Sequence, residues 1–376
     1  MMNVPFFNYS ARFAPDKDVI KELVYRSGTT DQFILKEDVR RLEEAICAYT
    51  GAAHAVAAAN GTSALVLLLR TMGAGPGVDV LTPAFSFIST ASAIRLLGAN
   101  PVFVDADPRT GMMDPADLER RITPQSRIVI PTHLFSVMAD MKAIRAVARE
   151  HGLLVLEDSA VALGASQDGV PAGRHGDAGL YSFFPAKPLG GIGDGAVIVT
   201  DDEELARGCR MLRNHGQDGV TRFLHHQLGY NSRMDEVLAG YLLHKLGRID
   251  RLLDRRRDLA ARYHEAFAGL DVRLAVTVDD HESRMYYTYV VQAERRDELR
   301  AELEEAGVET QVYYPAALPL QPAFADLGAR PGDYPGAERF ASRSLALPLY
   351  PEMPDGDVDE VIRAVVSFLA KEPQHA

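Results

Sequence analysis

Lys187 is the residue whose surroundings in the sequence point most directly to chemistry. It lies between aromatic and proline residues in YSFFPAKPLGGIGDGA, residues 181–196. Poor hydration there would lower the pKa of its amine from about 10.4 toward neutrality, and an unprotonated amine is what Schiff-base chemistry requires. The glycines that follow let this loop approach a ligand closely. Taken alone, the segment also fits an ordinary surface lysine.

A second candidate is Asp158, which directly follows the apolar run LLVLE at 153–157. A carboxylate at the mouth of a buried strand is costly unless it meets a cation or a hydrogen-bond donor. The alternative is that Asp158 caps the segment that follows.

The third candidate is the turn Asn60, Gly61, Thr62 and Ser63, between the runs AVAAA and SALVLLL. A turn of small residues at a helix N-terminus offers backbone N–H groups, the positive end of the helix dipole and hydroxyl groups, which together suit a phosphate. A plain helix cap explains the same residues, since asparagine, serine and threonine favour that position.

Together, the three candidates match the needs of pyridoxal 5′-phosphate (PLP). Its phosphate needs hydrogen-bond donors, its pyridine nitrogen needs a carboxylate to stay protonated, and its aldehyde needs a lysine. All three candidates are also predicted near strand ends, and ligands of open α/β sheets bind at the carboxyl ends of the strands. We therefore interpret them as one PLP site.

The composition fits an ordinary globular protein. The chain has 376 residues, 47% of them hydrophobic and 24% charged, and 40 basic against 52 acidic residues give a net charge of −12. Such an acidic chain is not expected to bind nucleic acid or anionic membranes. Cys47 and Cys209 are far apart, so neither a disulfide scaffold nor a metal site is expected. No apolar run approaches the ~20 residues of a membrane span, and a cytoplasmic location is expected.

The elements that must position these residues follow an α/β pattern. Short apolar runs alternate with helical stretches from about residue 50 to 200, which predicts βα units and a mostly parallel sheet. The predicted strands are 55–59, 79–82, 101–105, 127–131, 153–157, 178–183 and 196–200, with helices at 62–72 and 141–150.

Beyond residue 231 the pattern changes to a smaller α+β unit. One or two long helices are predicted over 234–267. Further predicted elements are strands at 285–292 and 309–313 and helices at 297–305 and 351–370. We predict a large PLP-binding domain at 1–245 and a small C-terminal domain at 246–376.

Ordered motifs run from Phe33 to Phe324: FILKEDVRRLEEAI, NGTSAL, PAFSFISTASAI, GANPVFVDADPRTGMMDP, RIVIPTHLF, VLEDSAVALGA, YSFFPAKPLGGIGDGA, RNHGQDG, GYNSRMDEVLAGYL and YYPAALPLQPAF. In these motifs the chain resembles the DegT/DnrJ/EryC1/StrS family of sugar aminotransferases. The resemblance implies a PLP-dependent fold-type I aminotransferase. Its large domain would hold a mostly parallel seven-stranded sheet, and its smaller C-terminal domain would be α+β.

The resemblance also implies a role for each candidate residue. Lys187 would bond to the cofactor's aldehyde and move protons, and Asp158 would pair with the pyridine nitrogen. Phe87 would stack on the ring, a role that a flat aromatic face suits, although a core phenylalanine is the alternative. The implied phosphate ligands are Gly61, Thr62, Ser63 and Ser182. Asn231, in GYNSR, would reach the phosphate in the neighbouring subunit, which implies a homodimer with shared active sites.

The implied reaction moves an amino group from L-glutamate to the ketone of a sugar. The form SFFPxKxLGxxGDG, with Asp194 before the last glycine, resembles the branch that acts on 3-keto nucleotide sugars in amino-sugar biosynthesis. The branches for 4-keto nucleotide sugars and for keto-cyclitols, which more often read EGG, are the alternatives. Candidate substrate contacts are His215, Gln217 and Tyr314, each equally well explained as a structural polar group.

Three positions depart from the family pattern. Val161 stands where a glutamine usually contacts the cofactor's O3′, and its side chain cannot donate a hydrogen bond, so another group or a water must substitute or the contact is absent. Pro319 replaces the histidine of PLHLQ, which removes a plausible substrate contact, and Ser136 replaces the glycine of HLYG.

Two other functions are weighed against transamination. A PLP-dependent sugar dehydratase in this family carries histidine in place of the lysine, so Lys187 argues against it. A regulatory protein would bind PLP or a sugar on the same fold without turnover, and the intact lysine argues against that as well.

Overall fold

The computed structural model describes residues 3–268, 270 and 284–370, and its centre is a seven-stranded sheet in the order β1-β9-β8-β5-β4-β2-β3. The strands are β1 (His54–Ala58), β2 (Asp79–Pro83), β3 (Asn100–Val104), β4 (Ser126–Val129), β5 (Leu154–Asp158), β8 (Ala178–Ser182) and β9 (Ala196–Thr200). β9 runs antiparallel to both of its neighbours, β1 and β8, and all other neighbouring strands of the sheet pair in parallel. The prediction of a mostly parallel α/β sheet is therefore confirmed.

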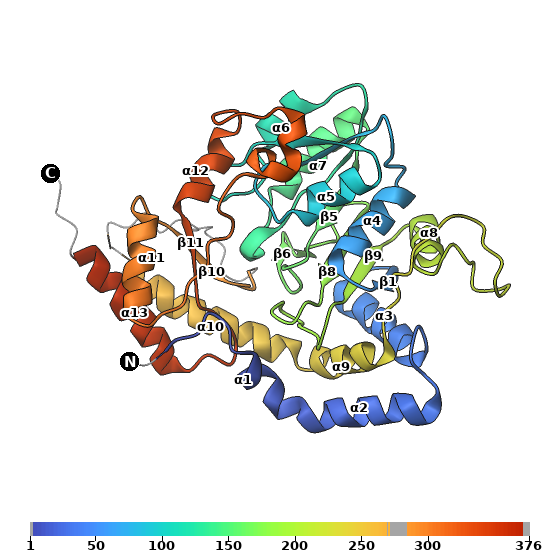
Figure 1. Ribbon diagram of the computed structural model, residues 1–376, viewed down its shortest axis with the longest axis horizontal. Helices are drawn as coiled ribbons and strands as arrows, with labels where there is room; N and C mark the ends of the chain where they lie inside the picture. The colour runs from blue at the N-terminus through green and yellow to red at the C-terminus, as the bar shows by residue number, and fades with distance from the viewer. Residues whose placement is uncertain (1–2, 269, 271–283, 371–376) are drawn as a thin grey trace.

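Helices cover both faces of this sheet because the strands are apolar on both faces. On one face, α4 (Gly61–Thr71), α5 (Ser89–Leu96) and α8 (Glu203–Arg213) pack on side chains such as Val80 and Ile198. On the other face, alternate residues such as Leu81 and Val199 meet α3 (Glu37–Thr50), α7 (Met141–His151), α9 (Glu236–Leu246) and α12 (Pro335–Arg343). The sheet is the middle layer of three (Figure 1).

The start of α4 explains why a small-residue turn lies at the end of β1. The side-chain oxygen of Asn60 accepts a hydrogen bond from the Ser63 N–H at 2.8 Å, which caps the helix. The following run of apolar residues, Ala64 to Leu69, is buried. The cap and the burial together fix the helix N-terminus at the sheet edge.

A second group of elements packs around its own apolar core. There, β10 (Tyr289–Gln292) pairs antiparallel with β11 (Ser344–Leu347), beside α10 (Ile249–Phe267), α11 (Arg296–Glu305) and α13 (Asp355–Ala370) (Figure 1). The long helix α10 belongs to both parts, since Leu253 lies in the core of the large sheet and Leu259 in the smaller core. The domain boundary at 245/246 stays a prediction.

The remaining elements are short or lie at the edges. They are α1 (Tyr9–Phe13), η1 (Ala14–Asp16), α2 (Lys17–Thr30), α6 (Pro115–Arg121), η2 (Leu134–Ser136), β6 (Ser166–Gln167), β7 (Val170–Pro171), η3 (Leu318–Leu320) and η4 (Pro322–Leu327). Across the residues that the structure describes, every helix is too short or too polar to cross a bilayer.

Two predicted strands need correction. The segment 309–313 is not a strand: Gln311 forms a single bridge to Ala346, while the Glu309 N–H turns to the carbonyl of Val4. The strand predicted at 285–292 begins only at Tyr289. Upstream of it Tyr286 has a φ of +47°, and its carbonyl accepts a hydrogen bond from Arg256 rather than from a strand.

Candidate active site

The loop that carries Lys187 connects β8 to β9 and folds into a tight turn. The Lys187 N–H donates to the Phe184 carbonyl at 2.8 Å, and the Gly191 N–H donates to the Phe183 carbonyl at 2.7 Å. Glycine is required at Gly190, where a Cβ would lie 2.1 Å from the Pro185 carbonyl oxygen. The turn therefore holds the backbone of Lys187 in one place.

The Lys187 amine is poorly hydrated, as the sequence predicts. Its Nζ lies 4.8 Å from the centre of the Tyr287 ring. Although the residue as a whole is only half-buried, burial of the amine lowers its pKa to about 8, while the nearby Asp158 carboxylate acts in the opposite direction. An amine of this kind exchanges its proton near neutral pH.

Asp158 is the last residue of β5 and is 7% exposed. Its Oδ1 accepts a hydrogen bond from the Ala160 N–H at 3.1 Å. Burial raises the pKa of this carboxyl group, and the hydrogen bond, Lys187 and His133 oppose the rise. Since Asp158 and Lys187 each act on the other's pKa, the structure brings these two predicted residues together.

The predicted phosphate ligands also meet at this sheet edge. A Cβ on Gly61 would lie 3.7 Å from Ser182 Oγ, so the start of α4 and the end of β8 touch. The Thr62 and Ser89 hydroxyls are 2.8 Å apart. The Gly61 and Thr62 N–H groups belong to the first helical turn, where the helix itself supplies no acceptor. The Ser63 N–H is instead used by the Asn60 cap.

Two aromatic residues, Phe87 and Tyr314, lie side by side near the predicted site residues. Phe87 is 55% exposed, which argues against the alternative of a core phenylalanine, and its ring centre lies 6.0 Å from that of Tyr314. Burial raises the pKa of Tyr314, and the charge of Asp158 adds to the rise. Of the three candidate substrate contacts, Tyr314 is thus the one placed beside the Lys187–Asp158 pair.

A separate cavity of about 590 Å³ is lined by one of the other two candidates, while His215 and Asn231 are not among its lining residues. Gln217 lines it, together with the cations Lys36, Arg210, Arg213, Arg222 and Arg233. The Asn231 side-chain oxygen accepts a hydrogen bond from Arg233 Nε at 3.0 Å. His215, in the same loop, has a φ of +58°. Among the hydrogen bonds, ion pairs and ring contacts of the described residues, none joins Asn231, His215 or Gln217 to Lys187.

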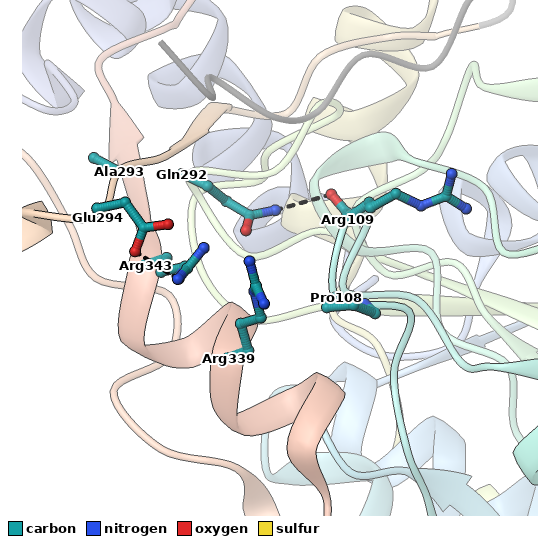
Figure 2. A pocket seen from close by; sticks show the side chains of 7 residues that line it. All are labelled: Pro108, Arg109, Gln292, Ala293, Glu294, Arg339 and Arg343. Atoms are coloured by element: carbon teal, nitrogen blue, oxygen red, sulfur yellow. Dashed lines mark hydrogen bonds and ion pairs between the residues drawn. The ribbon is translucent and has the colours of Figure 1, made fainter. Parts of the chain in front are cut away.

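A smaller cavity of about 210 Å³ lies between α12 and the loop at Arg109 (Figure 2). There the Gln292 amide donates to the Arg109 carbonyl at 2.9 Å, and Arg343 pairs with Glu294 at 2.5 Å. None of the predicted site residues lines this cavity.

Sequence reasoning missed two residues that touch the lysine. Tyr287 lies beneath the amine, and the buried Arg12 donates to the Lys187 carbonyl at 2.8 Å. Both are distant in sequence, and no motif singles them out. The departures Val161 and Pro319 are buried, and the η3 turn that holds Pro319 docks through a hydrogen bond from the Leu318 N–H to the Ala84 carbonyl, at the end of β2.

This chain matches one family over nearly its whole length. The model of the DegT/DnrJ/EryC1/StrS aminotransferase family covers residues 16–366. The chain belongs to the DegT/DnrJ/EryC1/StrS aminotransferase family. The resemblance drawn from the motifs is therefore confirmed.

Two curated proteins align with almost the whole chain. The chain is 42% identical to a pleiotropic regulatory protein of Geobacillus stearothermophilus, over 98% of this chain and 99% of that protein. It is 39% identical to the UDP-N-acetyl-3-dehydro-alpha-D-glucosamine 3-aminotransferase of Acidithiobacillus ferrooxidans, over 96% of this chain and 97% of that protein.

Several solved structures share the fold of this chain. S. venezuelae DesV, in complex with a ketimine intermediate, superposes with a TM-score of 0.95 at 36% identity, covering 99% of this chain and 100% of that chain. NtdA from Bacillus subtilis, with bound cofactor PMP, has a TM-score of 0.92 at 28% identity, covering 99% and 86%. The predicted fold-type I architecture is confirmed.

The lowered pKa of Lys187 predicts its reactivity in the cofactor-free aminotransferase. The amine is protonated below its pKa of about 8. The rate at which a small amine-reactive reagent modifies Lys187 should therefore rise with pH around that value. Mass spectrometry of the Lys187 peptide measures the rate, and Lys187→Ala is the control. A midpoint above about 10, the value of a hydrated lysine, would contradict the burial of the amine.

Proposed function

We propose that this protein is a PLP-dependent aminotransferase that moves an amino group from L-glutamate to an NDP-linked 3-keto sugar. The observation that carries the proposal is the buried Lys187 amine, whose pKa of about 8 reflects both its burial and the charge of the buried Asp158. A bound PMP in a solved relative supports the cofactor.

The residues present fit PLP. Asp158 is a buried carboxylate whose Oδ1 accepts a hydrogen bond from the Ala160 N–H, and because burial raises its pKa, a nearby positive charge would stabilise its ionised form. A protonated pyridine nitrogen would supply this positive charge. The Gly61 and Thr62 N–H groups and the Thr62 and Ser182 hydroxyls would hold the phosphate, and Phe87 would lie against the ring.

The cofactor, when bound, supplies an electron sink for the negative charge that develops at the amino-bearing carbon. The protein supplies the proton transfers. With a pKa of about 8, Lys187 accepts and releases a proton at little cost near neutral pH. Asp158 would hold the proton on the pyridine nitrogen. The ring of Tyr287 shields the amine from water on one side.

The choice of acceptor rests on relatives and on one loop motif. The Acidithiobacillus relative is named as a 3-aminotransferase of a UDP-linked 3-dehydro sugar. The loop of this chain has the GDG form at Gly193, Asp194 and Gly195. Both favour a 3-keto nucleotide sugar over a 4-keto sugar or a keto-cyclitol.

A homodimer with shared active sites accounts for the second cavity. The loop between Gln217 and Asn231 exposes the apolar side chains of Val220, Phe223 and Leu228. Apolar side chains grouped in this way favour a protein interface. We propose that this loop reaches the partner's site, where Asn231 would contact the phosphate and the cations would face the nucleotide's diphosphate.

A single-turnover assay tests the proposed reaction. Cofactor-loaded protein should convert L-glutamate to 2-oxoglutarate without an acceptor, and Lys187→Ala should lose this activity. With acceptors added, kcat/KM should be at least about tenfold higher for a 3-keto NDP-hexose than for 4-keto NDP-hexoses or inososes. Cofactor binding without release of 2-oxoglutarate would favour a regulatory protein and overturn the proposal.

Mixed dimers test whether the active sites are shared. Lys187→Ala and Asn231→Ala should each be strongly impaired alone. Refolding them together should restore about a quarter of wild-type activity, because half of the dimers then contain one intact site. Mixing without recovery, despite dimers in solution, would place Asn231 in its own subunit's site.

A further inference from the structure

We propose that Arg12 is a positioning residue for Lys187: from the N-terminal segment, its guanidinium fixes the backbone that aims the amine at Asp158. The proposal rests on the proposed role of Lys187 in transamination. It assigns a function to a residue 175 positions away from the lysine in the sequence.

The contacts are specific to the lysine loop. Arg12 lies on α1 and is 3% exposed. Its Nη2 donates to the Lys187 carbonyl at 2.8 Å and to the Pro188 carbonyl at 3.0 Å. Among the hydrogen bonds of the described residues, no other donor reaches these two carbonyls. Pro188 has no N–H of its own, so this part of the loop depends on Arg12.

Few other polar interactions stabilise the charge of Arg12. Its Nε and Nη1 atoms are buried and have no hydrogen-bond partner in the described chain. Burial lowers the pKa of Arg12 and Glu352 opposes the change, while Arg12 in turn disfavours the charged forms of Lys245 and Arg256. A guanidinium stays charged in proteins, and a buried charge is costly. Its two bonds to the loop explain why the cost is tolerated.

The segment around Arg12 is anchored on both sides. Upstream, the Val4 N–H donates to Gly307 at 2.8 Å, which ties the segment to the smaller core. Downstream, Asp16 accepts a hydrogen bond from the Tyr241 hydroxyl at 2.9 Å and pairs with Arg248. The dark-blue chain end runs between these two regions (Figure 1). Arg12 therefore presents its guanidinium to the loop from a fixed position.

The test measures the lysine itself in the cofactor-free protein. The groups that act on the Lys187 amine are Asp158 and the ring of Tyr287. In Arg12→Met the loop should relax and the amine should gain water. The pH midpoint of Lys187 modification should then move from about 8 toward 10.4. Arg12→Lys, which keeps the charge without the planar fork, should lie between the two.

Kinetics of the loaded enzyme give a second readout. Arg12→Met should lower kcat by at least about tenfold, because the amine is misplaced, with KM for L-glutamate changed by less than about threefold. Arg248→Ala is the matched control. It removes one partner of Asp16 but leaves the hydrogen bond from the Tyr241 hydroxyl that anchors the same segment, and Arg248 contacts neither carbonyl of the loop, so its midpoint should stay near 8.

A midpoint for Arg12→Met equal to that of wild type would overturn the proposal and leave Arg12 a structural residue. If Arg12→Met does not fold, the midpoint of Arg12→Lys is measured instead, and a value equal to that of wild type would overturn the proposal. The two proposals fail separately. A wild-type midpoint near 8 that shifts in Arg12→Met, without release of 2-oxoglutarate, would overturn transamination and leave the positioning role intact.

Discussion

The proposed active site depends on one amine and one carboxylate that are both poorly hydrated and that act on each other's pKa. Asp158 ends β5, and parallel pairing sets it opposite Leu180 on β8, two residues before Ser182. The loop that leaves β8 then returns Lys187 to the same edge. Burial lowers the pKa of the amine and raises that of the acid, whereas their mutual attraction opposes both changes. Burial thus favours the neutral amine that an aldehyde requires, and the charge of Lys187 favours the ionised Asp158 that a basic ring nitrogen requires.

Much of this could be predicted because the chemistry lies in short segments next to strand ends. Lys187, Asp158 and Gly61 each follow or precede an apolar run, so parallel strands bring them to one edge. Arg12 and Tyr287 could not be predicted in this way, because they reach the site from distant parts of the chain. The strand expected at 309–313 failed for a related reason: its backbone partners, Val4 and Ala346, come from two different segments.

The second cavity shows the limit of reasoning from a single chain. Gln217 and Asn231 lie in a loop whose apolar side chains are exposed, beside a group of arginines. Their sequence motifs match the family, but their contacts within this chain do not reach the lysine. The proposed homodimer would resolve the difference, since the motif would then act across an interface.

The most direct test of the central pairing is the pKa of Lys187 in cofactor-free Asp158→Asn. The carboxylate raises the pKa of the amine and burial lowers it. Removal of the carboxylate should therefore move the midpoint of Lys187 modification below the wild-type value of about 8. A midpoint that stays the same, in a variant that folds normally, would show that the two groups do not act on each other and would contradict the account.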